Sequence, residues 1–166
     1  MNNTQLFGDK LFFAIELGAP TTQGKSKLGF WIENKRLGNF TKSGELKYSI
    51  KAFQQFINNK DFYYLTLLDN KTPVEIFEYF LCFDLLNSRK KSDVEEVERR
   101  LKFYLFFGDQ FANQTGGFIL LYTSGMVIFI IKRPMNGPVD RYDVPFQFFC
   151  DTFNNYIEYL SKAYVN

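Results

Sequence analysis

The chain has 166 residues, a length typical of one domain, and its 46% hydrophobic and 23% charged residues are ordinary for a folded protein. The net charge of +2 argues against a strongly basic nucleic-acid binder, and the absence of histidine excludes His-based nucleophile pairs and zinc sites with a histidine ligand. We therefore expect a single domain over residues 1–166, without a sequence signature of catalysis.

The first 45 residues predict a small antiparallel meander. Apolar residues that alternate with other residues predict three strands, at residues 11–17, 27–33 and 36–40. In the second strand, Trp31 lies on the face opposite to Phe30. A tryptophan at this position either closes a second layer of the core or stays partly exposed as an anchor for a partner.

Beyond the meander, the helical spacing of apolar residues and capping signals predict four helices. They begin near residues 43, 72, 92 and 145. Pro73 between Thr72 and Glu75 marks the second start as a capping box, and Ser92 with Glu95 indicates another. Residues 62–67 are expected to form a short strand or an extended connector.

The third predicted helix combines an apolar stripe with a charged face. The stripe is expected to face the core and consists of Val94, Val97, Leu101 and Tyr104. On the other face, the spacing predicts the ion pairs Glu95–Arg99 and Glu98–Lys102. Mixed charge of this kind usually belongs to a solvated helix face.

Residues 118–122 and 126–132 form the clearest predicted hairpin. Both strands are apolar on both faces, so we expect a sheet that is covered on two sides. Asp140 and Asp143 precede the last helix, and Asp143, close to its start, is expected to cap it or to interact with its dipole. The pattern predicts an α+β fold: a mostly antiparallel sheet, built from an N-terminal β-meander and a later β-hairpin and packed by about four helices.

Few residues suggest a chemical function. Cys82 and Cys150 lie in apolar segments, and we expect two buried thiols or, as the alternative, a disulfide between two core helices. Basic residues near the first hairpin, together with Trp31, Tyr63 and Tyr64, leave open a small-ligand or nucleic-acid-binding module. A hydrolase with an Asp, Glu and Lys site is a further alternative, against which the missing histidine argues.

Two segments of the sequence indicate the cellular compartment of the protein. Residues 1–5 are polar and lack the pattern of a signal peptide. The apolar run at residues 118–131 is shorter than the roughly 20 residues that span a bilayer, and polar residues interrupt it. We therefore expect a cytoplasmic protein with no membrane contact.

Two motifs in the first 45 residues carry a resemblance. They are Phe7-Gly8-Asp9-x-x-Phe12-Phe13-Ala14-Ile15-Glu16 and Gly29-Phe30-Trp31-Ile32-Glu33-Asn34-Lys35-Arg36-Leu37-Gly38. Together they resemble an immunity-protein family of bacterial polymorphic-toxin and contact-dependent-inhibition systems, the family numbered forty-two. A later segment, Gly108-Asp109-Gln110-Phe111, and the closing amphipathic helix match that family in outline.

The resemblance implies a binding protein without catalysis or cofactor, which occludes a cognate toxin domain in the cytoplasm. Many such toxins act on nucleic acids and are basic, so carboxylates would steer and orient the toxin. Nominated by charge, the candidate contacts are Asp93, Glu95, Glu96 and Glu98, followed by Asp140 and Asp143, with Trp31 as an aromatic anchor. A direct nucleic-acid partner is not expected.

Overall fold

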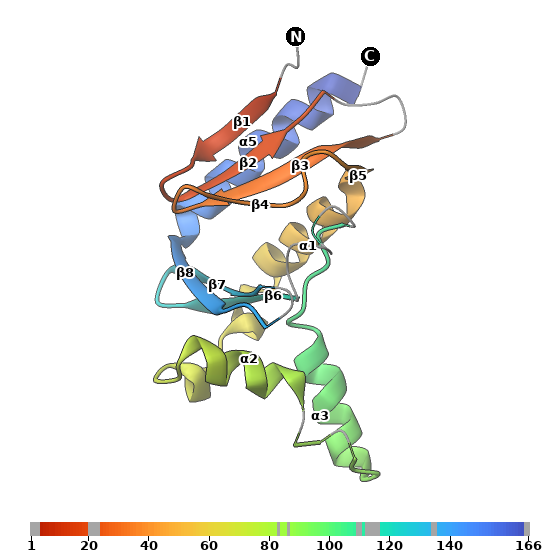
Figure 1. Cartoon of the computed structure of the whole chain (residues 1–166), viewed down its shortest axis with the longest axis vertical. Helices are drawn as coiled ribbons and strands as arrows, with labels where there is room; N and C mark the ends of the chain where they lie inside the picture. Colours follow the sequence, from red (N-terminus) through yellow and green to blue (C-terminus); the bar gives the residue numbers. More distant parts are fainter. Residues whose placement is uncertain are drawn as a thin grey trace.

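The computed structural model describes residues 4–19, 24–82, 84–85, 87–108, 111, 117–133 and 136–164. Two antiparallel sheets lie one above the other along the long axis, and helices pack against them (Figure 1). The predicted α+β class is confirmed, because the N-terminal meander and the later hairpin supply the antiparallel strands. The meander and the hairpin belong to separate sheets.

The first sheet has five strands. β1 (Gln5–Asp9), β2 (Phe13–Leu17), β3 (Lys25–Ile32) and β4 (Lys35–Leu37) pair in chain order, and β5 (Ser43–Glu45) pairs with the beginning of β3. β1 is an addition to the predicted meander. Residues 11 and 12, expected within the first strand, belong instead to the turn between β1 and β2.

The second sheet has three strands, β6 (Gly117–Thr123), β7 (Met126–Lys132) and β8 (Val139–Pro145), in that order. The predicted hairpin turn is confirmed, and Ser124 and Gly125 have the positive φ angles, 47° and 80°, of a tight primed turn. β8 was missed. Its Asp140 and Asp143 therefore lie in a strand, and Asp143, expected at the start of the last helix, pairs with Arg141 of the same strand.

The helices include α1 (Leu46–Asn58), α2 (Pro73–Leu81), α3 (Lys91–Leu101) and α5 (Phe146–Tyr164), with two short 3-10 helices, η1 (Lys60–Tyr63) and η2 (Thr66–Leu68). The capping box of α2 is confirmed: Glu75 N–H donates to Thr72 Oγ1 at 3.2 Å, and Thr72 N–H donates to Glu75 Oε2 at 2.8 Å. The box expected at Ser92 is wrong, because the N-cap of α3 is Lys90, two residues earlier, and its side chain makes no capping hydrogen bond.

An aromatic cluster joins the two sheets. The Phe13 ring of the first sheet lies 5.6 Å from the Phe129 ring of the second, and 5.1 Å from Phe149 of α5. Phe53 of α1 contacts both Phe13 and Phe149, at 6.0 and 5.3 Å. Many of the 21 phenylalanines therefore serve the core.

The second sheet is covered on two sides, as predicted. Side chains on successive positions of β7, from Val127 to Ile131, are all at most 5% exposed. α2 contacts β7 and β8 from below, and α1 and α5 lie above the sheet (Figure 1). α2 and α3 form the lower end of the molecule in this view.

One glycine is required where α5 meets the first sheet. Gly8 has a φ of +88°, and a Cβ added there would lie 2.4 Å from Phe13 O and 2.7 Å from Thr152 Oγ1. The absence of a side chain therefore allows α5 to approach the β1–β2 turn closely. That turn is closed by Asp9, whose Oδ1 accepts a 2.8 Å hydrogen bond from Leu11 N–H.

Candidate partner-binding surfaces

The sequence-nominated residues divide between two parts of the molecule. Asp93, Glu95, Glu96 and Glu98 lie on α3, at the lower end in Figure 1. Trp31 lies on β3, and Asp140 and Asp143 lie on β8. A partner with a small interface could therefore contact the α3 carboxylates without contacting the residues on β3 and β8.

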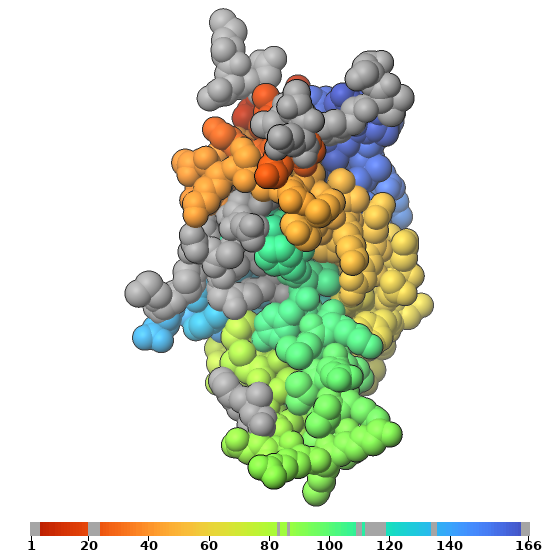
Figure 2. Space-filling view, turned by 90° about the vertical axis from the view of Figure 1, so that its right-hand side faces the viewer, coloured from red at the N-terminus to blue at the C-terminus, as the bar shows by residue number. Residues whose placement is uncertain are grey.

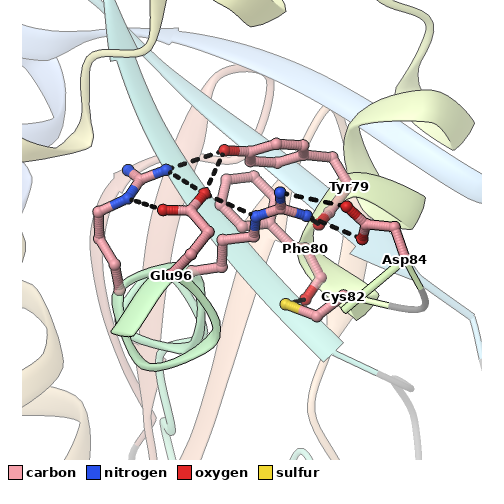
Figure 3. Close-up of polar contacts among 7 residues, drawn as sticks. Tyr79, Phe80, Cys82, Asp84 and Glu96 are labelled. Atoms are coloured by element: carbon pink, nitrogen blue, oxygen red, sulfur yellow. Dashed lines mark hydrogen bonds and ion pairs between the residues drawn. The ribbon is translucent and has the colours of Figure 1, made fainter. Parts of the chain in front are cut away.

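Glu96 is the centre of a polar network that holds α3 to α2 (Figure 3). Its carboxylate accepts hydrogen bonds from Arg99 Nε and Arg100 Nε, at 2.7 and 2.8 Å, and from Tyr79 Oη at 3.1 Å. The bonds from Arg99 are the main reason that the pKa of Glu96 falls to about 2, against the opposing effect of burial. Glu96 is thus committed to the protein's own structure.

Arg100 crosses from α3 to the end of α2. Its side chain is 9% exposed, and its guanidinium lies 3.9 Å from the centre of the Tyr79 ring. Nη1 donates to Tyr79 O at 2.8 Å and to Asp84 Oδ1 at 3.1 Å (Figure 3). A buried arginine is therefore the residue through which α3 is attached, although the sequence predicted an apolar stripe for that purpose.

The predicted apolar stripe of α3 partly faces solvent. Val94 is 47% and Leu101 is 53% exposed, because the side of the helix that carries Glu96 and Arg100 turns toward α2. The apolar contact to the core comes instead from Phe103, just beyond α3, whose ring lies 4.8 Å from Phe80. The expected core-facing stripe is thus wrong for Val94 and Leu101.

The other α3 carboxylates differ in their hydrogen-bond and ion-pair partners. Asp93 accepts a short hydrogen bond from Ser88, and Glu95 pairs with Lys91 at 3.7 Å. The predicted pair of Glu95 with Arg99 is wrong, because Arg99 turns to Glu96. Glu98 is exposed and has no ion-pair partner among the described residues, so the predicted pair with Lys102 is also wrong there.

Trp31 lies on the outer face of the first sheet, which no helix covers in Figure 1. Its Nε1–H donates to Glu16 Oε2 at 2.7 Å, and the same oxygen pairs with Arg36 Nη2 at 2.8 Å. Lys10 Nζ lies 4.0 Å from the indole ring centre. The tryptophan is therefore half-buried by polar neighbours, which is intermediate between the two predicted environments.

A glycine makes room for this arrangement. A Cβ added to Gly29 would lie 3.3 Å from Arg36 Nε and from Leu37 O, tighter than most real contacts. Arg36 can therefore lie flat over Gly29, and its guanidinium carbon sits 4.0 Å from the centre of the Phe40 ring. Residues quoted for the family resemblance, Gly29 and Arg36 among them, thus build the outer face of the sheet.

The carboxylates of β8 are already paired with arginines. Asp140 Oδ2 accepts a 2.9 Å hydrogen bond from Arg133 Nε, and Asp143 binds Arg141 through both oxygens, at 2.8 and 3.1 Å. Their negative charge is therefore largely neutralised at the surface. Near them, Lys35 Nζ donates to Tyr142 Oη at 3.4 Å and links the β3–β4 turn to β8.

A groove that the sequence did not reveal opens beside this sheet. It encloses about 260 Å³ between η1–η2, the beginning of α2 and the β6–β7 hairpin. Its floor is aliphatic and consists of Leu68, Ile76, Leu121 and Ile128, and its rim includes Tyr64, Asp69 and Arg141. The short strand or extended connector predicted at residues 62–67 is instead part of η1, η2 and the link between them, which forms one side of the groove. We call this hollow the hairpin groove.

A second hollow of about 290 Å³ lies between α1 and residues 104–106. It is lined by Tyr48, Lys51, Tyr104 and Phe106, among others. Figure 2 shows this side of the molecule, with α1, the segment after α3 and α3 itself all exposed. The rings of Tyr48 and Phe106 contact each other at 5.1 Å and partly fill the rim.

The described residues offer binding surfaces without an evident reaction centre. Among them, no group of three or more Cys, Asp or Glu side chains is arranged to hold a metal ion. Cys82 and Cys150 are both free thiols, and burial raises the pKa of each, which disfavours the reactive thiolate. None of the described helices has the length and apolar character needed to cross a membrane.

Comparison with known proteins extends the resemblance seen in the first 45 residues. A family model described as immunity protein 42 matches residues 5–159. Among solved structures, CdiI from Burkholderia dolosa has a similar fold, with a TM-score of 0.62 and 11% identity over 93% of this chain and 99% of that chain. At this identity the structural likeness shows the fold alone. No curated protein matches the sequence.

Proposed function

Because the chain belongs to the immunity protein 42 family, we propose that it binds a cognate toxin domain in the cytoplasm and neutralises it by covering the toxin's active site or substrate surface. The single observation that carries this proposal is the family match over residues 5–159. Immunity proteins act as binding inhibitors, so the protein is not an enzyme.

The geometry of the molecule supports inhibition by binding. Its core is a continuous set of packed aromatic rings that fixes both sheets, and such rigidity reduces the entropic cost of association. Its surface offers exposed aromatic and aliphatic side chains next to charged ones, the composition of protein interfaces. A toxin would be excluded from its substrate by the volume of the bound domain, without any chemical step.

Two of the nominated carboxylates support alternative contact surfaces for the toxin. Glu98, which has no ion-pair partner in the described part of the chain, lies on α3 between the exposed side chains of Val94 and Leu101. Asp143 lies beside the hairpin groove, because its partner Arg141 lines that groove. Glu96 and Asp140 are held by internal arginines, and we propose structural roles for them.

A co-expression experiment tests the proposed function. The partner is first isolated by pull-down of the tagged protein from its host's lysate at moderate salt, with identification by mass spectrometry. Recovery of a toxic C-terminal domain of a large secreted protein, and restored growth when both are co-expressed, are expected. If the recovered domain remains toxic in the presence of this protein, the proposed function is wrong.

The second candidate function is nucleic-acid or small-ligand binding on the outer face of the first sheet. The observation in its favour is the position of Lys10 and Arg36 beside the ring of Trp31. Two observations count against it: Glu16 already neutralises Arg36, and Tyr63, expected to belong to the same platform, is 1% exposed. Nucleic-acid binding would weaken steeply with rising salt, which a filter-binding titration measures directly.

A further inference from the structure

We propose that the hairpin groove is the anchor site for the toxin: it receives one apolar side chain of the toxin, and Asp69 at its rim pairs with a lysine or arginine next to that side chain. This inference rests on the proposed function. It assigns the groove to a protein partner with a basic surface, and it makes the groove the energetic centre of the interface.

The floor of the groove is preformed by secondary structure. Leu121 and Ile128 are directly opposite each other in the β6–β7 pair, and each is 5% exposed. Ile76, 1% exposed, is fixed in the first turns of α2 behind the capping box, and Leu68, 4% exposed, ends η2. A side chain that enters the groove therefore meets a rigid apolar surface and orders little of the protein on binding.

The size of the groove favours a side chain over a free ligand. Its volume of about 260 Å³ lies below the range of roughly 300–1,000 Å³ that is usual for pockets that enclose small-molecule ligands. A hollow of this size matches a single large residue that projects from a protein surface. Such residues in well-packed pockets dominate binding energy at protein interfaces.

The rim has further apolar surface available for contact. Tyr64, which lines the groove, is 43% exposed; Leu67 in the same short segment is 53% exposed but does not line the groove. Exposed tyrosines are enriched in interfaces because they provide a large apolar ring with a polar end at little conformational cost. The groove therefore combines an apolar floor with a partly exposed aromatic ring at its rim.

The charges around the groove determine the sign of the partner. Arg141 is bound by both oxygens of Asp143, so this pair has little net charge. Lys60 does not line the groove; it keeps its charge, and its ammonium lies over the rings of Tyr122 and Phe146, at 5.0 and 5.1 Å. Asp69 is exposed and its carboxylate has no hydrogen bond or ion pair within the described residues. Among the charged residues that line the groove, Arg141 is paired with Asp143, so the carboxylate left to pair with a partner is that of Asp69, which favours a cation at this point of the rim.

The test compares groove variants with matched variants on α3, the rival surface. Asp69→Lys is matched by Glu98→Lys, and Tyr64→Ala by Leu101→Ala; all four positions are exposed, and thermal unfolding checks that each variant is folded. The probe is the toxin domain recovered by pull-down, immobilised as an inactive variant for surface plasmon resonance.

Each groove variant is expected to weaken the affinity by about tenfold or more, mainly through faster dissociation. The α3 variants are expected to change the affinity by less than about threefold. A reciprocal change of the contacting toxin lysine or arginine to Glu should restore binding to Asp69→Lys but not to the unsubstituted protein.

Two results would overturn the inference. If both groove variants bind the toxin with the affinity of the unsubstituted protein, the toxin does not use the groove. If only the α3 variants lose affinity, the interface lies on α3. If the unsubstituted protein itself fails to bind the toxin domain, the proposed function is wrong. This result differs from failure of the groove inference, in which the unsubstituted protein binds and the groove variants bind equally well.

Discussion

Replacement of Arg100 by methionine is expected to destabilise the protein more than any other single change on α3. The substitution keeps an unbranched apolar stem of similar reach and removes only the guanidinium. The lost contacts are those to Glu96 at 2.8 Å, to Asp84 at 3.1 Å, to the Tyr79 carbonyl at 2.8 Å and to the Tyr79 ring at 3.9 Å.

The magnitude follows from burial. Removal of one partner of a fully buried pair costs about 3–5 kcal/mol. Here Arg100 is 9% exposed, but Glu96 is 30% exposed and keeps its bonds from Arg99, while Asp84 is 60% exposed and can be rehydrated. We therefore expect a loss of about 2–3 kcal/mol in the free energy of unfolding. For a protein of this length, that corresponds to a decrease of roughly 4–12 °C in Tm.

Urea denaturation followed by circular dichroism measures this loss. Arg99→Met is the matched control, because Arg99 also binds Glu96 but is 35% exposed, and its loss should cost about 1 kcal/mol or less. An Arg100→Met protein that is no less stable than the Arg99→Met control would refute the reasoning that Arg100 attaches α3 to the body.

Three further predictions concern stability. Because the pKa of Glu96 is lowered to about 2 from 4.5, its contribution is fully present above pH 4.5 and is lost as the pH falls toward 2; Glu96→Gln should remove this part of the acid sensitivity in urea titrations at several pH values. Gly8→Ala should cost about 2 kcal/mol or more, whereas Gly125→Ala, with a φ of +80° but open space around the added Cβ, should cost about 1 kcal/mol; equal losses in thermal unfolding would contradict the proposed close approach at Gly8. Trp31→Phe removes the hydrogen bond to Glu16 and should cost about 1 kcal/mol by circular dichroism, and an unchanged midpoint would show that this bond contributes nothing.

The sequence predicted correctly those elements that are determined by interactions between neighbouring residues. The capping box at Thr72, the primed turn at Ser124-Gly125 and the amphipathic pattern of α5 are written within a few neighbouring residues, and all three are present. β8 was missed because only two buried residues, Tyr142 and Val144, carry its alternating pattern, and the segment was assigned to the approach to the last helix. Only its pairing with β7, which is a tertiary contact, makes this segment a strand.

The candidate sites were predictable only in part, for a related reason. Charge nominated Glu96 and Asp140, but whether a carboxylate is free depends on arginines that the fold brings near it. In α3, the apolar stripe was a reasonable expectation, and the buried Arg100 replaced it because Tyr79 and Asp84 of the neighbouring helix end satisfy the guanidinium. The hairpin groove depends on three separate elements, so no single stretch of sequence contains it.

The packing of α5 against β1 sets the order in which the protein can be completed as it leaves the ribosome. Phe7, near the beginning of the sequence, is covered by Tyr156 and Tyr159 of the last helix, at ring distances of 5.7 and 5.4 Å. The meander is synthesised first but stays uncovered until α5 has emerged, roughly seven seconds or more later at bacterial rates of about 20 residues per second. The first sheet is therefore completed only after α5 has been synthesised, and a chain that stops before α5 leaves the Phe7 ring without this cover.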